Sequence, residues 1–216
     1  MVLSFWYRML MLLFEMHSSC ISHILHAKSN LSLYTNQIIQ SILHKLSFID
    51  TFQVVVANAG DAKAVLARST STDGEGAVVD TKSVLKAIVL TREHKAIFPQ
   101  ERLRIQKAGG SVGPNGRLQG RIEVSRALGD RHFKKVGLIA TPDVHSFELT
   151  KKDHFIILGC DGLWGVFGPS DAVEFVQKQL KETSSATLAV RRLVKEAVRE
   201  RRCKDNCTAV LIVFKH

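Results

Sequence analysis

The strongest structural signals of the chain lie in Phe155-Ile-Ile-Leu-Gly-Cys-Asp-Gly-Leu-Trp164. The apolar first half of this stretch predicts a buried strand that ends near Cys160, and Asp161-Gly162 predicts a turn directly after it. A carboxylate at the end of a buried strand is costly unless it meets a cation or hydrogen-bond donors. Asp161 is therefore the first candidate functional residue.

A second acidic turn precedes the last strand of the chain. Asp205-Asn206 comes just before the apolar stretch Thr208–Phe214. If this strand and the strand that ends at Cys160 are antiparallel neighbours, Asp161 and Asp205 lie at the same edge of a sheet. Mg²⁺ and Mn²⁺ prefer such carboxylate oxygens, with waters completing the shell. Each Asp can instead cap its own turn, and the spacing alone leaves both interpretations open.

The rest of the pattern predicts an α+β fold with mainly antiparallel sheet. Apolar strands at 53–58 and 62–67 flank the tight turn Ala59-Gly60-Asp61, which predicts a hairpin. Strand pairs followed by helices, without strict alternation, are typical of this fold class. The sequence predicts one more strand at 86–90, a surface loop at 69–83, and helices at 99–108, 169–180 and 185–202.

Residues 1–52 differ in composition from the rest of the chain. They contain no glycine or proline, and the first glycine is Gly60. We expect them to form a mostly helical segment outside the domain, which would occupy residues 53–214. The apolar stretch at 5–16 is interrupted by Arg8 and has neither a basic leading region nor a small-residue cleavage site, unlike a signal peptide.

The charge is strongly basic, with 30 Lys and Arg against 20 Asp and Glu. This balance favours acidic partners. The basic positions of the last helix have the spacing of a solvated face, and few aromatics accompany them, so no nucleic acid is expected. No apolar run reaches the roughly 18 residues of a membrane span. Four cysteines are too few for a disulfide framework, which favours a reducing, cytoplasmic or nuclear location.

Five motifs, in order, resemble those of the metal-dependent type 2C (PPM-type) Ser/Thr protein phosphatases. The similarity is strongest to the branch of integrin-linked-kinase-associated phosphatases and their plant relatives. The motifs are VANAGDAKAVL at 56–66, TREHK with ER, RI and GG at 91–110, VSRALGD at 124–130, CDGLW at 160–164 and DN at 205–206.

The resemblance implies a β-sandwich of two mainly antiparallel sheets flanked by helices, with two Mg²⁺ or Mn²⁺ ions at the sheet edges. A metal-bound water would hydrolyse phosphoserine or phosphothreonine of a protein substrate. Asp161 and Asp205 would be metal ligands, and Glu93 stands where the family usually has an Asp that binds a weaker third ion. Motif residues expected to have structural roles are Asp61, Ser125, Arg126, Gly129, Asp130, Gly162 and Asn206.

One departure from the family pattern bears on activity. The family takes a phosphate-binding Arg, a metal-bridging Asp and a general-acid His from an N-terminal segment that includes a DGHGG motif. Because no glycine precedes Gly60, that motif is absent from residues 1–59, and we assign no catalytic acid in this sequence. Metal binding is then expected to be weakened. The expectations are a monomeric phosphatase or, alternatively, an inactive fragment that binds partners.

Overall fold

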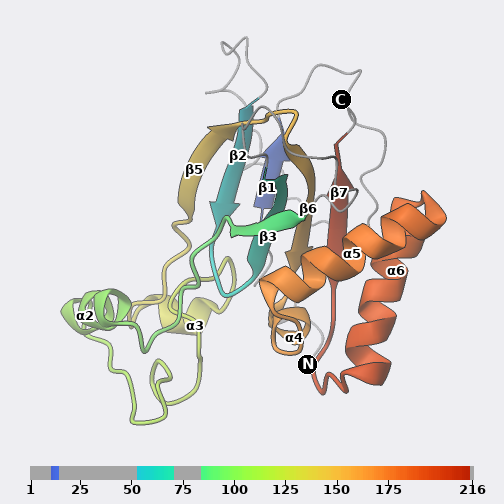
Figure 1. Cartoon of the computed structure of the whole chain (residues 1–216). Coiled ribbons are helices and arrows are strands. Elements are labelled where there is room, and N and C mark those ends of the chain that lie inside the picture. Colours follow the sequence, from blue (N-terminus) through green and yellow to red (C-terminus); the bar gives the residue numbers. More distant parts are fainter. Residues whose placement is uncertain (1–10, 15–52, 71–83, 215–216) are drawn as a thin grey trace. The chain divides into compact units, whose positions relative to one another are not determined.

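The computed structural model describes residues 11–14, 53–70 and 84–214 of the chain. Within them, strands form two sheets (Figure 1). One has the order β1-β2-β5, with strands Met11–Phe14, Gln53–Asn58 and Asp143–Glu148. The other has the order β4-β3-β6-β7, with strands Leu85–Val89, Lys63–Ser69, Asp153–Gly159 and Ala209–Val213. Together with the helices, these sheets confirm the predicted α+β class.

The pairing of β6 with β7 confirms the condition on which the candidate site depends. The two strands are antiparallel, with a register that runs from Phe155 opposite Val213 to Gly159 opposite Ala209. β3 also pairs antiparallel with β4, from Val65 opposite Val89 to Ser69 opposite Leu85. The last residue of β6 and the first residue of β7 therefore meet at one edge of the sheet.

The hairpin predicted for β2 and β3 is wrong, because the two strands belong to different sheets. The turn between them is held by His94 instead. The Gly60 amide donates to His94 Nδ1 at 3.2 Å, and the His94 amide donates to the Gly60 carbonyl at 2.9 Å. Gly60 has a φ of 136°, which a side chain would disfavour. Local sequence cannot show this, because His94 is 34 residues away.

Two further strands differ from the sequence prediction. Met11–Phe14 forms β1, so the helical prediction is wrong for these four residues. A short apolar run fits a strand or a helix equally well, and here a neighbouring strand supplies the backbone partners. β5 was not predicted, because most of its side chains are exposed and few are apolar. The other residues of 1–52 and nearly all of the predicted loop at 69–83 lie outside the described residues.

The three long helices follow the predicted positions. They are α2 at Pro99–Lys107, α5 at Pro169–Thr183 and α6 at Ala186–Lys195. A π-helical turn, η2 at Glu196–Glu200, continues α6 toward the predicted end. Single-turn helices occur at α3, Arg131–Lys134, and α4, Asp161–Trp164. α5 contacts β4 and α6 contacts β7, so the two helices pack on the four-stranded sheet and on each other (Figure 1).

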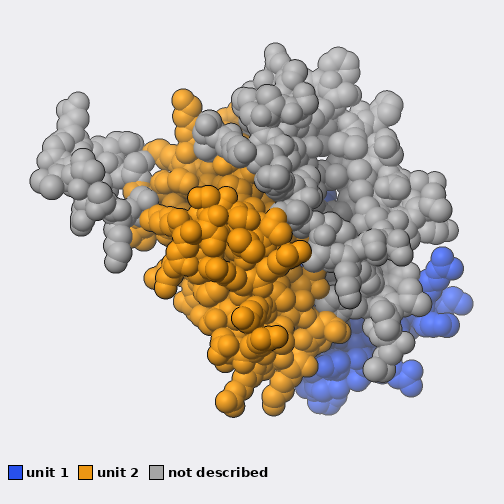
Figure 2. Space-filling model, turned by 90° about the vertical axis from the view of Figure 1, so that its right-hand side faces the viewer, with its two compact units in different colours: residues 1–12, 56–63, 91–145 blue, residues 13–55, 64–90, 146–216 orange. Residues whose placement is uncertain are grey.

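The chain divides into two compact units, which Figure 2 shows in different colours. Unit 1 comprises residues 1–12, 56–63 and 91–145, and unit 2 comprises 13–55, 64–90 and 146–216. In the described part of unit 1, Ile105, Leu118, Val124 and Leu138 form the core. In unit 2 the core includes Phe155, Leu163, Phe167, Val176, Leu193 and Leu211. Among the described residues, none of the helices has the length and apolar character that crossing a bilayer requires.

Candidate metal site

Asp161 and Asp205 lie in two adjacent connections at one end of the β6–β7 pair, in unit 2. Asp161 is the first residue of α4, two positions after β6 ends, and Asp205 precedes β7 by four positions. The pairing continues past the strands, since the Cys160 amide donates to the Thr208 carbonyl at 3.3 Å. Asp161 is half-buried and Asp205 is exposed. The shared edge predicted from the sequence is therefore present.

The two connections are in backbone contact at Gly162. A Cβ atom on Gly162 would lie 2.2 Å from the Asn206 carbonyl oxygen, which is far inside van der Waals contact. Only glycine allows this approach, and it brings the residues that follow Asp161 and Asp205 against one another. The structural roles of Gly162 and Asn206 stay predictions, and this contact is the observation that supports them.

Each carboxylate also caps its own turn. The Gly162 amide donates to Asp161 Oδ1 at 2.9 Å, and the Asn206 amide donates to Asp205 Oδ1 at 2.7 Å. The two interpretations left open by the sequence are therefore compatible. These hydrogen bonds fix the orientation of both carboxylates before any ion is bound.

The donor chemistry fits a hard, hydrated divalent cation. Two carboxylates supply oxygen ligands, and Mg²⁺ typically keeps several waters beside one or two carboxylates. In the part of the chain that the structure describes, no group of three or more His, Cys, Asp or Glu side chains could hold a metal ion. The two carboxylates therefore suit an ion whose remaining ligands are water molecules, rather than an ion enclosed entirely by protein ligands.

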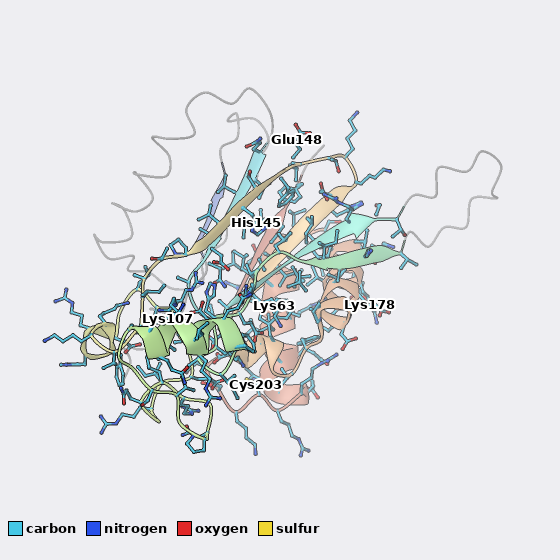
Figure 3. The ribbon with its side chains drawn as sticks, turned by 90° about the vertical axis from the view of Figure 1, so that its left-hand side faces the viewer. Lys63, Lys107, His145, Glu148, Lys178 and Cys203 are labelled. Carbon is cyan, nitrogen blue, oxygen red and sulfur yellow. The ribbon has the colours of Figure 1, made fainter. Side chains whose placement is uncertain are left out.

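Glu93, the third predicted ligand, lies in unit 1 between two lysines. Its carboxylate oxygens are 3.1 Å from Lys63 Nζ and 3.7 Å from Lys95 Nζ (Figure 3 labels Lys63). Lys95 also pairs with Glu123 at 3.0 Å. Two ammonium groups already compensate the Glu93 charge, so a cation would have to compete with them. Its metal role stays a prediction.

Arg126 of the SRALGD motif organises an ionic network within unit 1. It is 2.7 Å from Glu101 and 2.8 Å from Asp143, and Arg104 is 2.6 Å from Glu101. Burial alone would raise the pKa of Glu101, but hydrogen bonds from Arg126 and Arg104 outweigh it and lower the pKa to about 2. Arg104 also donates to the Ser125 and Gly137 carbonyls, so the network holds three segments together.

His94 belongs to the same network and has a structural role. The ring is fully buried, and because Nδ1 accepts from the Gly60 amide, Nε2 carries the proton and donates to Asp143 at 3.0 Å. Burial is the main reason why the pKa of His94 is lowered, even though the bond to Asp143 opposes the shift. Because both ring nitrogens of this buried, neutral histidine already form hydrogen bonds within the core, His94 is not placed to donate a proton to a substrate. Sequence reasoning missed Asp143, because nothing in its local pattern sets it apart.

The remaining motif residues of unit 1 also occupy structural positions. Asp61 is buried in the turn after β2, close enough to Lys95 to contribute to its raised pKa. Asp130 has a left-handed φ of 55° at the start of α3, and its carbonyl accepts from the Phe133 amide. Gly129 before it and Ser125 are buried. The structural roles of these four residues stay predictions.

Three cysteines surround the contact between Gly162 and Asn206. Cys160 Sγ donates to the Asn206 carbonyl at 3.2 Å, and Cys203 Sγ donates to the Gly162 carbonyl at 3.0 Å. Burial, with contributions from Cys160 and Cys203, raises the pKa of the Cys207 thiol to about 12. The sequence shows that Cys203 and Cys207 flank Asp205, but only the fold adds Cys160 to them.

Comparison with known proteins gives the family. The model of the family "Protein phosphatase 2C" matches residues 38–207. "Probable protein phosphatase 2C 67" of Oryza sativa subsp. japonica is 94% identical over 163 residues, which cover 76% of this chain and 44% of that protein. The human "Integrin-linked kinase-associated serine/threonine phosphatase 2C" is 38% identical over 173 residues, covering 74% and 41%.

Solved structures agree with this assignment. A serine-threonine phosphatase 2C from Toxoplasma gondii superposes with a TM-score of 0.64 at 25% identity, covering 84% of this chain and 65% of that one. The chain spans less than half the length of the curated relatives above. Because the family model covers most of its residues, this chain belongs to the protein phosphatase 2C family.

Proposed function

We propose that this chain supplies metal-binding carboxylates of a Ser/Thr protein phosphatase, which hydrolyses phosphoserine and phosphothreonine in a protein substrate. The observation that supports this most is the convergence of Asp161 and Asp205 at one end of the β6–β7 pair, fixed by the contact of Gly162 with Asn206. Both residues lie in motifs that match the family. The proposed ions are Mg²⁺ or Mn²⁺.

The chain's own residues would hold and orient the metal. Asp161 and Asp205 would each bind through carboxylate oxygen, with their orientation set by the amides of Gly162 and Asn206. A divalent ion bound there would supply an activated water and neutralise charge on the phosphoryl group. The basic charge of the chain, +10, favours the approach of a phosphorylated segment.

A second candidate function is a catalytically inactive module that binds partners. It is favoured by the absence of a DGHGG motif from the sequence and of a third metal-holding side chain near the pair in the described residues. We therefore expect the chain by itself to hydrolyse a phosphothreonine peptide several orders of magnitude more slowly than a complete relative. No residue is assigned to bridge two ions or to protonate the leaving group.

The first test is metal binding, measured by titration calorimetry with Mn²⁺ on the whole chain and on Asp161→Asn and Asp205→Asn. Each substitution should weaken Mn²⁺ binding on the order of tenfold or more, because it removes one of two charged ligands. Asp171→Asn is the matched control, since Asp171 is an exposed carboxylate of the same unit at the start of α5. Equal affinity in all four proteins would show that the pair binds no metal.

Hydrolysis of the phosphothreonine peptide, with and without Mn²⁺, separates the two candidate functions. Metal-dependent turnover that both Asp variants lose and Asp171→Asn keeps would support the phosphatase. Metal binding without turnover, in a chain that unfolds cooperatively, would support the inactive module.

A further inference from the structure

Three cations follow one another along the outer face of α6 and η2, and we call them the cationic line. Arg191, Lys195 and Arg199 are spaced four residues apart, and all three are exposed. Residues four apart lie on the same side of a helix. The opposite side places Leu193 and Ala197 in the core of unit 2. The cationic line is therefore presented to solvent over two helical turns.

The π-helical turn of η2 keeps the third cation on this line. In an α-helix, four residues complete slightly more than one turn, so each step of four changes the direction by about 40°. In η2 the Arg201 amide donates to the Glu196 carbonyl at 3.0 Å, which is the wider hydrogen bonding of a π turn. Four residues complete less than one turn there, so Arg199 turns back toward the direction of Arg191.

The cationic line lacks the counter-charges that neighbouring arginines have. Arg192 is 3.4 Å from Glu182, and Arg201 is 3.8 Å from Asp171. Within the described residues, no ion pair involves any of the three cations of the line. Like charges four residues apart on a helix repel one another. An anionic partner bound across the line would be attracted by all three charges and would relieve this repulsion.

The partner that fits the cationic line best is an extended acidic protein segment. Cations four residues apart on a helix are about 6 Å apart along its axis. Alternate side chains of an extended chain, which point to the same side, are about 7 Å apart. Leu188, an exposed apolar side chain, lies one turn before Arg191 and extends the line toward a protein partner. Nucleic acid fits less well, because α6 and η2 contain no aromatic side chain on which bases could stack.

We propose that the cationic line docks an acidic segment of the phosphorylated protein substrate, with carboxylates at alternate positions. Figure 1 shows the chain passing from the end of α6 to β7, and Asp205 lies on this connection, six positions after Arg199. A segment docked on the line would thus hold a phosphorylated residue of the same substrate close to the loop of Asp205. The choice of a substrate as the partner rests on the proposed function, whereas the binding of an acidic segment does not.

Fluorescence anisotropy with labelled peptides measures docking on the whole chain. One peptide carries three Glu residues at alternate positions beside a threonine, and a second carries Gln at the same three positions. Each is made with threonine and with phosphothreonine. We expect the Glu peptide to bind on the order of tenfold more tightly than the Gln peptide at low salt, with or without the phosphate. Added salt should reduce this preference. Equal affinity for the Glu and Gln peptides would overturn the proposal.

A pair of triple variants separates the cationic line from the general basic charge. The line variant combines Arg191→Gln, Lys195→Gln and Arg199→Gln and should lose most of the preference for the Glu peptide. The control combines three exposed lysines of the same unit, of which Figure 3 labels the second: Lys151→Gln, Lys178→Gln and Lys181→Gln. The control removes the same charge and should keep the preference. Thermal unfolding verifies that both variants fold, and an equal loss of preference in the two would refute docking on the line.

Competition and phosphate dependence complete the test. Duplex DNA or phosphatidylserine vesicles that displace the Glu peptide, and that bind the line variant more weakly, would overturn an acidic protein segment as the occupant. Phosphothreonine that adds no affinity in the presence of Mn²⁺, and is not hydrolysed, would refute the proposed function. The preference for Glu over Gln in the threonine peptides still decides the docking site in that case, because these peptides carry no phosphate.

Discussion

At the scale of single residues, Gly162 is the position on which the candidate site depends most. A methyl group on Gly162 would lie 2.2 Å from the Asn206 carbonyl oxygen, and this backbone oxygen cannot rotate away from it. The surrounding carboxylates are cap residues of ordinary turns, and only this close approach makes them a pair. The candidate site therefore depends on the lack of a side chain at Gly162 as well as on the two carboxylates.

Gly162→Ala should therefore destabilise unit 2 and weaken metal binding together. The new methyl group must push the Asp205 loop away from α4, at a cost of about 1–3 kcal/mol for an overpacked position. Gly168→Ala is the control, because a Cβ there meets first the side chain of Asp171, at 3.2 Å, which can move. Urea unfolding and Mn²⁺ titration measure both effects. Equal stability of the two variants would show that the contact is looser than described.

The carboxylate of Glu101 makes the stability of unit 1 depend on pH. Its pKa is lowered from 4.5 to about 2 in the folded chain, so folding stabilises the charged form. The contribution is fully present above the unfolded pKa of 4.5 and is lost as the pH falls toward 2. At neutral pH it amounts to about 3 kcal/mol, since one pKa unit corresponds to about 1.4 kcal/mol.

Denaturant unfolding between pH 6 and pH 2 measures this dependence. Glu101→Gln should be less stable than the unsubstituted chain at pH 6, and the difference should shrink steadily as the pH approaches 2. Glu148→Gln is the control, because Glu148 is an exposed carboxylate at the end of β5 (Figure 3). A constant difference between Glu101→Gln and the unsubstituted chain across this range would contradict the lowered pKa.

At the scale of elements, an ion pair that sequence reasoning missed connects β3 to β6. Asp153, fully buried at the start of β6, accepts from Arg68 at 2.6 Å and from the Thr150 amide and hydroxyl. These bonds lower the pKa of Asp153, although burial acts in the opposite direction. Asp153 therefore fixes both the turn before β6 and the place of β3 beside it.

Asp153→Ala should lower the free energy of unfolding by about 2 kcal/mol, because it removes a buried carboxylate that accepts from Arg68 and leaves the Thr150 donors without their acceptor. Asp171→Ala, an exposed acidic position on α5, should change it by less than about 0.5 kcal/mol. Thermal unfolding of the two variants beside the unsubstituted chain provides the comparison. Similar midpoints for both variants would show that the Arg68 pair adds little to stability.

At the scale of the whole molecule, the two compact units carry different motifs of the protein phosphatase 2C family. The two candidate ligands, Asp161 and Asp205, both lie in unit 2, whereas the SRALGD and TREHK motifs lie in unit 1. In unit 1, His94 and Arg126 of these motifs belong to one ionic network, and the metal role of Glu93 stays a prediction. The motifs of this chain thus include residues of the ionic network as well as the candidate metal ligands.

Local sequence signals predict the helices and the strands rich in apolar residues, and the motifs indicate the family. Proline at the first turn of α2 and α5 and the unbroken apolar run of β6 are local signals, because they depend on residues next to one another. The sequence also predicted the convergence of Asp161 with Asp205, provided that two strands were neighbours. Local signals failed for β5, whose side chains are mostly exposed, and for the four residues of β1.

Which strands share a sheet, and which polar groups come into contact, is visible in the folded chain but not in its local sequence. The turn between β2 and β3, which belong to different sheets, is held by hydrogen bonds to His94. The ion-pair partners of Arg126 come from α2 and β5. The grouping of Cys160 with Cys203 and Cys207 likewise requires β6 and β7 to pair. Such contacts join residues tens of positions apart, and their energies depend on burial and distance, which no short stretch of sequence specifies.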